Sequence, residues 1–220
     1  LRRGGRLDGG ILRITATEVA LRVFLLPVLS RFRARYPGVH IKLLNSSTPA
    51  AIEELNKGLA DLAFVTTPAD ITQKLRSTPL ADVQEVAVCG GAYRSLTGCK
   101  VTLEALSGYP LISLGEHGST YRLYRQFFAD HHVPFEPDIE AATADQILPM
   151  VKANLGIGFV PASFLSEADW GQSIYPIDLA QKLPPRQVCL VESAQYSAAA
   201  AAQELKKICF AHSAAVDLFP

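Results

Sequence analysis

Short loops rich in hydroxyl side chains recur along this sequence, each next to the expected end of a strand or start of a helix. Backbone amides at a helix start lack intrahelical partners and carry partial positive charge, so such loops favour anions. The predicted chemistry is the binding of a small carboxylate, phosphate or sulfate. The candidate ligand-binding residues, of which Glu18 is the charged member, are Thr15, Thr17, Glu18, Ser46, Ser47, Thr48, Thr66, Gly118, Ser119, Thr120 and Thr143.

A simpler interpretation exists for each of these residues. Thr48, Ser119 and Thr143 stand where a side chain caps its own helix, which is the commoner role of such residues, so the set carries more weight than its members. Arg122 or Arg125 could pair with a ligand carboxylate, although arginines on helices are more often solvated. His117 is likewise expected at the surface. If the hydroxyls bind an effector, Thr17→Ala or Ser47→Ala should weaken its binding and leave folding largely intact.

Motifs for catalysis or metal binding are weak in this chain. The sequence contains no Gly-x-Ser-x-Gly elbow, no phosphate loop with Gly-Lys-Ser/Thr and no His-Glu-x-x-His. Cys209 and His212 would supply two metal ligands where a structural site needs about four. The adjacent His131 and His132 cannot point the same way on a regular element and are expected at the surface. We therefore predict no enzyme activity, no metal site and no cofactor.

Strands and helices alternate along the chain, the pattern of an α/β protein whose strands lie parallel and are joined by right-handed crossovers. Strands are expected over residues 11–14, 39–44, 62–65, 86–89, 111–114, 139–142, 157–160 and 188–191. Helices are expected over 19–36, from Thr48 to a stop at Gly58, after Ser119, after Thr143, and from Ser197 to Phe210. The extended stretch 75–88 links two similar rounds of alternating strands and helices.

Pro27 and Pro149 fall inside expected helices, where proline predicts a kink or a new start. Thr48 is the expected N-cap before Pro49, and Thr143 with Gln146 has capping-box spacing.

Two such rounds predict two Rossmann-like lobes joined by a two-crossing hinge. Residues 10–83 with 188–212 are expected to form lobe I, and residues 84–187 lobe II. Ligands of such sheets bind outside the carboxyl ends of the strands, so a ligand cleft is expected between the lobes. Residues 1–9 are basic and rich in glycine, which is typical of the remnant of a linker.

The composition excludes several classes of protein. The 220 residues are 49% hydrophobic, enough for a sizeable core, and Lys+Arg and Asp+Glu both number 21. A chain without net charge is not drawn to nucleic acid. No apolar run approaches the ~20 residues that span a bilayer, and the start lacks the apolar core of a signal peptide. The chain is therefore expected to be soluble and cytoplasmic, with its four cysteines as reduced thiols.

The sequence resembles the effector-binding domain of LysR-type transcriptional regulators over roughly residues 8 to 210. The segments that carry the resemblance are Gly10 to Ile14, Leu26 to Leu29 with Phe32, Tyr36 to Val39, Gly58 to Ala63, and Val151 with Gly156 to Pro161. The resemblance implies a fold like that of type II periplasmic binding proteins. It also implies that a small metabolite in the cleft changes how the subunits of a homodimer or homotetramer are arranged on DNA.

By position, the contact loops of that family correspond to residues 15–18, 46–48, 66–67, 118–120 and 142–143. The family implies that DNA is contacted only through an N-terminal winged helix-turn-helix domain outside this chain, with no membrane partner. A redox-sensing version is disfavoured, because Cys89 and Cys99 lie on an expected strand and its following loop.

Two other functions share the two-lobed plan. The first is a solute-binding protein of a transporter, against which the linker-like start and the lack of a signal peptide argue. The second is an enzyme on the same scaffold, which would need an acid, base or metal constellation in the cleft.

Overall fold

The computed structural model describes residues 9–166 and 169–216, so the predicted linker lies outside the described residues except for Gly9. The fold is mixed α/β with two sheets, as predicted. The chain divides into two compact units: unit 2 contains Val83–Arg186, and unit 1 contains the described residues before and after it. The chain therefore crosses between the units twice, after Asp82 and after Arg186.

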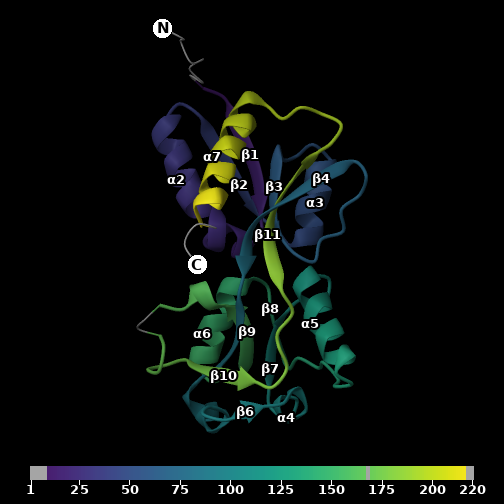
Figure 1. Ribbon diagram of the computed structural model, residues 1–220, viewed down its shortest axis with the longest axis vertical. Coiled ribbons are helices and arrows are strands. Elements are labelled where there is room, and N and C mark those ends of the chain that lie inside the picture. Colours follow the sequence, from purple (N-terminus) through teal and green to yellow (C-terminus); the bar gives the residue numbers. More distant parts are fainter. Residues whose placement is uncertain (1–8, 167–168, 217–220) are drawn as a thin grey trace. The chain divides into compact units, whose positions relative to one another are not determined.

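The sheet of unit 1 has the strand order β2-β1-β3-β11-β4 (Figure 1). Its strands are β1 (Ile11–Ala16), β2 (His40–Asn45), β3 (Leu62–Thr66), β4 (Leu75–Val83) and β11 (Arg186–Ser193). Strand β1 pairs in parallel with both β2 and β3, whereas β11 is antiparallel to β3. The carboxyl ends of β1, β2 and β3 consequently share one edge of the sheet.

The helices of unit 1 are α1 (Glu18–Ala20), α2 (Leu26–Arg35), α3 (Thr48–Asn56) and α7 (Ala200–Val216). A π-helical segment, η1 (Leu21–Leu25), joins α1 to α2, and the Leu26 amide donates to the carbonyl of Leu21. The change of helical repeat places Pro27 in the first turn of α2, where a missing N–H is tolerated. The new start predicted at Pro27 is thus accommodated without a break in the helical path.

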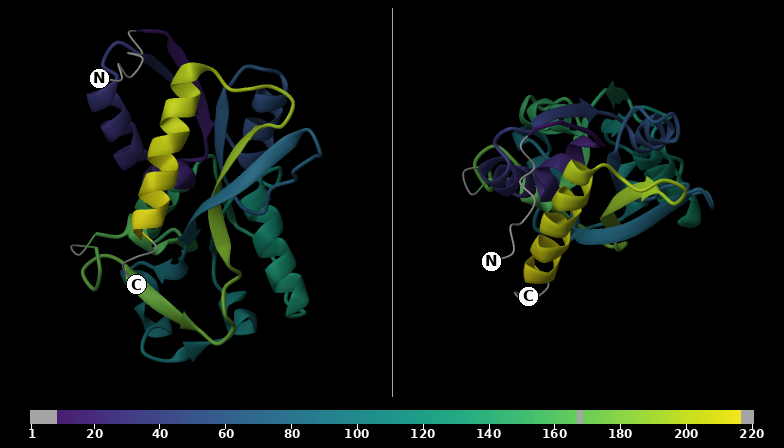
Figure 2. Two further views of the ribbon diagram at one scale, coloured as in Figure 1. Left: turned by 45° about the horizontal axis from the view of Figure 1, so that its top comes forward. Right: turned by 90° about the horizontal axis from the view of Figure 1, so that it is seen from above.

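Helices cover both faces of this sheet. Helix α3 packs Ala51, Ile52 and Leu55 against Ala63 and Val65 of β3. Because side chains alternate along a strand, Leu62 and Phe64 point to the other face. Helices α2 and α7 lie side by side (Figures 1 and 2), and the Tyr36 hydroxyl donates to the Glu204 carboxylate across 2.6 Å.

The sheet of unit 2 has the order β6-β10-β5-β9-β7-β8. Its strands are β5 (Glu85–Cys89), β6 (Lys100–Val101), β7 (Leu111–Leu114), β8 (Ile139–Ala141), β9 (Ile157–Pro161) and β10 (Tyr175–Leu179). Strand β7 is parallel to β8 and β9, and β5 is antiparallel to β9 and β10. Strands β6 and β10 were not predicted, because β6 has only two residues and Pro176 interrupts the sequence of β10.

The helices of unit 2 are short except for α5. They are η2 (Gly91–Leu96), α4 (Leu103–Leu106), α5 (Ser119–Asp130), η3 (Ala144–Gln146), α6 (Ile147–Lys152) and η4 (Ala162–Phe164). Pro149 is the third residue of α6, so its missing N–H costs no hydrogen bond. The kink predicted there is replaced by the change from the 3₁₀ turn η3 to α6.

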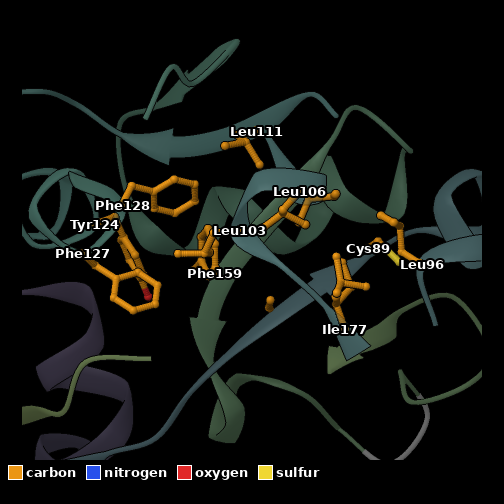
Figure 3. Close-up of a cluster of buried hydrophobic side chains, with 13 residues drawn as sticks. Cys89, Leu96, Leu103, Leu106, Leu111, Tyr124, Phe127, Phe128, Phe159 and Ile177 are labelled. Atoms are coloured by element: carbon orange, nitrogen blue, oxygen red, sulfur yellow. The ribbon is translucent and has the colours of Figure 1, made fainter. Parts of the chain in front are cut away.

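An aromatic cluster forms the core of unit 2. Figure 3 shows Tyr124, Phe127 and Phe128 of α5 gathered beside Phe159 of β9, and the rings of Tyr124 and Phe159 stack with centroids 4.5 Å apart. Leu123 of the same helix is only partly buried, whereas Tyr124 is buried. Burying each such side chain contributes about 2 kcal/mol.

Close approach of α6 to β9 depends on Gly158. A Cβ atom at this position would lie 2.5 Å from Cγ2 of Ile147 and 3.1 Å from Cγ2 of Val151. The absence of a side chain at Gly158 therefore sets how closely the helix can pack on the strand.

Candidate functional site

Two of the predicted hydroxyls in unit 1 meet where β1 and β3 end. The Oγ1 atoms of Thr17 and Thr66 lie 2.7 Å apart, and both residues are buried. The Thr17 oxygen also accepts from the Ala20 amide at 3.1 Å and so caps α1. The pair carries two hydroxyl protons and uses one between them, so one proton is left to donate to a third group.

Thr48 connects this pair to α3. Its hydroxyl donates to the Thr66 carbonyl at 2.9 Å and accepts from the Thr66 amide at 3.3 Å. The prediction that Thr48 is the N-cap of its helix is wrong. Ser47 is the N-cap, with its Oγ accepting from the Ala50 amide at 3.4 Å, while Thr48 begins the helix.

The remaining predicted residues of unit 1 have other neighbours. Thr15 is fully buried on β1, and its hydroxyl has no hydrogen-bond partner among the described residues. The Ser46 hydroxyl donates to the Glu54 carboxylate at 2.9 Å. The Glu18 carboxylate, in the first turn of α1, accepts from the Asn45 side-chain amide at 2.7 Å. The structure thus gathers Thr17, Thr48 and Thr66 directly.

The predicted residues of unit 2 follow β7 and β8. Gly118 is the N-cap of α5 and supplies no side-chain cap, so the first amides of this helix remain available. Ser119 is buried in the first turn, and Thr120 beside it is half-buried. The arrangement suits a negatively charged ligand atom at the start of α5.

Thr143 is the N-cap of η3, but the capping box predicted for it is not formed. The Thr143 side chain makes no capping bond to its helix. The Gln146 side chain instead accepts from the Ala142 amide at 2.9 Å, one residue further back than a capping box requires.

A buried network of charged and polar side chains also contacts Thr120. Nη2 of Arg186 donates to the Thr120 hydroxyl at 2.9 Å, and Nη1 donates to the Glu85 carboxylate at 2.5 Å. The Tyr124 hydroxyl donates to the second Glu85 oxygen at 2.9 Å. Burial and the Glu85 charge raise the pKa of Tyr124 well above its usual range, so the phenol stays protonated.

Reasoning from the sequence missed Arg186 and Glu85. These two residues are 101 positions apart, and each side chain is only 2% exposed. A buried ion pair between distant segments produces no periodicity or motif. The one available signal was that each residue lies close to one end of the predicted lobe II. Glu85 lies near the first predicted chain crossing, and Arg186 lies near the second.

The other chemically capable residues lie apart from these clusters. Arg125 and His117 are exposed. All four cysteines are free, as predicted, and Cys99 alone among them is exposed. Burial raises the pKa of the Cys209 thiol to about 12, which keeps it an unreactive thiol. Within residues 9–166 and 169–216, no three His, Cys, Asp or Glu side chains are grouped as a metal site would require.

Two cavities lie away from the predicted residues. One of about 950 Å³ opens in unit 1 near Asp61, Lys74 and Glu192, at the opposite edge of the sheet from Thr17 and Thr66. The other, of about 350 Å³, lies in unit 2 between β5 and the segment 176–185. Neither of these two cavities is lined by a predicted ligand-binding residue.

None of the helices in the described part of the chain combines the length and the apolar character needed to cross a bilayer.

Comparison with known proteins identifies the family. The family model described as LysR substrate binding domain matches residues 5–214. The transcriptional regulator CysB of Burkholderia cenocepacia is 30% identical over 171 residues, which cover 77% of this chain and 55% of that protein. The chain thus spans about half the length of such curated relatives.

Solved structures share the fold at low sequence identity. The regulatory domain of CcmR from Synechocystis PCC6803, in complex with 2-PG, superposes with a TM-score of 0.81 at 17% identity, covering 92% of this chain and 96% of that one. The effector-binding domain of QuiR, in complex with shikimate, gives a TM-score of 0.79 at 13% identity, covering 94% and 98%. The fold is that of LysR effector-binding domains, of the type II periplasmic-binding-protein kind, as the resemblance implied. On the family match and the shared fold, the chain belongs to the LysR substrate-binding domain family.

Proposed function

We propose that this chain senses a small anionic metabolite on behalf of a LysR-type transcriptional regulator. Membership of the family supports the sensing role. The observation that carries the ligand class is the Thr17–Thr66 pair, because it leaves one hydroxyl proton that needs an acceptor. Thr17 is 8% exposed and Thr66 only 1%, which favours Thr66 donating to Thr17 and Thr17 donating outward.

The start of α5 offers the same kind of group. Its first amides have no side-chain cap, and helix starts favour negative charge. Hydrogen-bond donors aimed at a ligand select one rich in acceptors, such as a carboxylate, phosphate or sulfate. The structure of QuiR with shikimate, which is a carboxylate, shows that this fold hosts such a ligand in another protein. The predicted cleft between the lobes stays a prediction.

We further propose that the whole regulator is a homodimer or homotetramer that contacts DNA through an N-terminal helix-turn-helix domain. Strand β2 is an edge strand of its sheet, and it exposes Leu43 and Leu44. An exposed edge with apolar side chains favours pairing with another chain. In this proposal the domain is a cytoplasmic sensor that does not catalyse a reaction, and no membrane takes part.

Thermal unfolding in the presence of defined compounds tests the ligand class. Sulfate, inorganic phosphate and shikimate are the anionic probes, with glucose and putrescine as neutral and cationic controls. A ligand at 100 times its Kd stabilises the native state by about 2.7 kcal/mol, which raises the unfolding temperature by several degrees. At least one anion should do so, and glucose and putrescine should not.

The site is tested with matched variants. Thr17→Val should lower the affinity for the stabilising anion about tenfold, because one charge-assisted hydrogen bond is lost. Thr97→Val, which removes a hydroxyl that donates to the Arg94 carbonyl, is the control and should bind like the wild type. Stabilisation by putrescine or glucose alone would contradict the proposed anion class.

A further inference from the structure

Four side chains of unit 2 form what we term the Arg186 network: Arg186, Glu85, Tyr124 and Thr120. Arg186 and Glu85 form an ion pair with Nη1 and Oε1 2.5 Å apart, and Tyr124 holds the other Glu85 oxygen. Arg186 extends the network to Thr120 through Nη2. Unpaired charges are rarely buried, so the pairing with Glu85 explains how Arg186 can be only 3% exposed.

The network fixes the direction of the Thr120 hydroxyl. A guanidinium can only donate, so the Thr120 oxygen must accept from Arg186. The hydroxyl proton of Thr120 is then directed away from the guanidinium and is free to donate elsewhere. Thr120 lies in the first turn of α5, next to the uncapped amides that favour an anion.

The charge of Arg186 itself contributes little to such a ligand. The Glu85 carboxylate lies in direct contact with the guanidinium, so the pair has no net charge. The Tyr124 hydroxyl holds that carboxylate in place, and the Tyr124 ring is fixed by its stacking on Phe159 (Figure 3). Arg186 can act on an anion instead through the orientation of Thr120, whose hydroxyl it contacts.

We propose that Arg186 is a positioning residue of the effector site, which turns the Thr120 hydroxyl into a hydrogen-bond donor toward the bound anion. The inference rests on the proposed function, since it assigns a donor group for the anion proposed at the start of α5. Glu85 and Tyr124 act behind Arg186 by holding its guanidinium in the one position from which it reaches Thr120.

The network also lies beside both chain crossings. Arg186 is the last residue of unit 2 before the second crossing, and Glu85 is the third residue after the first. In unit 1, the Gln187 side chain donates to the Asp82 carboxylate at 2.9 Å. Each unit therefore has a side-chain contact of its own between the two crossing segments, Gln187 with Asp82 in unit 1 and Arg186 with Glu85 in unit 2. Thr120 is thus tied, through Arg186 and Glu85, to both crossing segments of its unit.

Calorimetric titration of variants with sulfate, inorganic phosphate and shikimate tests the proposal. Thr120→Val should bind the best anion about tenfold more weakly, while Thr120→Ser, which keeps the hydroxyl, should bind like the wild type. Arg186→Lys keeps the charge but cannot hold Glu85 and Thr120 together, and a similar loss is expected. The double variant Arg186→Lys/Thr120→Val should bind no more weakly than Thr120→Val alone.

Arg76→Lys is the matched control, because Arg76 pairs with Glu192 in unit 1 and touches none of the network. It should leave anion affinity unchanged. If Arg186→Lys is too unstable to purify, Tyr124→Phe takes its place, because it removes one hydrogen bond that holds Glu85. This variant should weaken anion binding about threefold in the wild-type background and not at all in the Thr120→Val background.

The proposal is overturned if Arg186→Lys, or Tyr124→Phe in its place, binds the anion like the wild type. It is also overturned if the losses multiply in the double variant to about a hundredfold, because a merely structural Arg186 would act independently of Thr120. A wild-type chain that binds none of the three anions would instead overturn the proposed function, and this inference with it.

Discussion

The hydroxyl oxygens of Thr17 and Thr66 lie 2.7 Å apart, although the two residues are 49 positions apart in the chain. The parallel pairing of β1 with β3 produces this contact, because it places the ends of both strands at the same edge of the sheet. Both residues are buried, so a hydroxyl that loses this partner gives up a hydrogen bond that water cannot readily replace.

Removing one hydroxyl of this pair should therefore cost more than half of what removing both costs. We expect Thr66→Val to lower the free energy of unfolding by about 1–3 kcal/mol. Thr17→Val should also lose the α1 cap, worth about 1 kcal/mol. In the double variant no hydroxyl remains unpaired, so its loss should be smaller than the sum of the single losses. Urea unfolding of the four proteins measures the cycle, and strict additivity would mean that the contact has no energetic weight.

The Arg186–Glu85 pair should be far more sensitive than a partly exposed pair. Glu85→Ala leaves a buried guanidinium without its counter-charge and should cost about 3–5 kcal/mol of stability. Arg76→Ala breaks a pair whose arginine side chain is 66% exposed, and should cost less than about 1 kcal/mol. Urea unfolding of both variants makes the comparison, and equal losses would contradict the burial argument.

The contact between α6 and β9 should not tolerate a methyl group at Gly158. Gly158→Ala places a Cβ against the branched side chains of Ile147 and Val151, and such overpacking should cost about 1–3 kcal/mol. Gly91→Ala is the control, since a Cβ there meets no atom within 4 Å. If thermal unfolding showed the two variants to be equally stable, the packing of α6 would have to be looser than described.

His212 should make the stability of unit 1 depend on pH in the weakly acidic range. Burial beside Phe24, and secondarily the charge of Arg31, lower the pKa of His212 below its usual value of about 6.5. The unfolded chain then binds more protons than the folded one as pH falls below that value, so stability falls until the folded pKa has been passed.

His212→Gln removes this titration. Between pH 7.5 and pH 5.5 the wild type should lose more free energy of unfolding, measured in urea, than His212→Gln does. The carboxylates titrate alike in both proteins, so the difference isolates His212. An identical pH dependence would show that its protonation is not linked to folding.

The exposed edge strand β2 gives a prediction about assembly. Leu44→Asp should shift the domain toward monomers without unfolding it, because Leu44 is 48% exposed and lies on an unpaired edge. Leu155→Asp, at a similarly exposed position in unit 2, is the control. Sedimentation velocity over a range of concentrations distinguishes the two, and an unchanged oligomer in Leu44→Asp would place the interface elsewhere.

Local patterns predicted the strands and helices well where one chemical signal dominated. The apolar run 62–65 and the stop at Gly58, whose φ is +70°, correspond to β3 and the end of α3. Strand β10 escaped prediction, because Pro176 interrupts its sequence and its pairing with β5 is set by a distant segment.

The candidate site was predicted only in part, for a related reason. Hydroxyls near strand ends are visible in a sequence, but which of them pair with each other depends on strand order. The contacts of Thr66 with Thr17 and Thr48 follow from the position of β3 beside β1, and no sequence motif specifies it. Arg186 was missed because its partners lie in two other segments of the chain.

The position of β11 between β3 and β4 has a consequence for folding. The described part of unit 2 is continuous in the chain apart from residues 167–168, whereas unit 1 gains one strand of its sheet and α7 only from residues after 186. During synthesis, therefore, the second unit can form while the first still lacks a strand. Strand β4 cannot pair with β11, its neighbour in the sheet, until the ribosome has passed Ser193. The half of the molecule that is made first is the last to be completed.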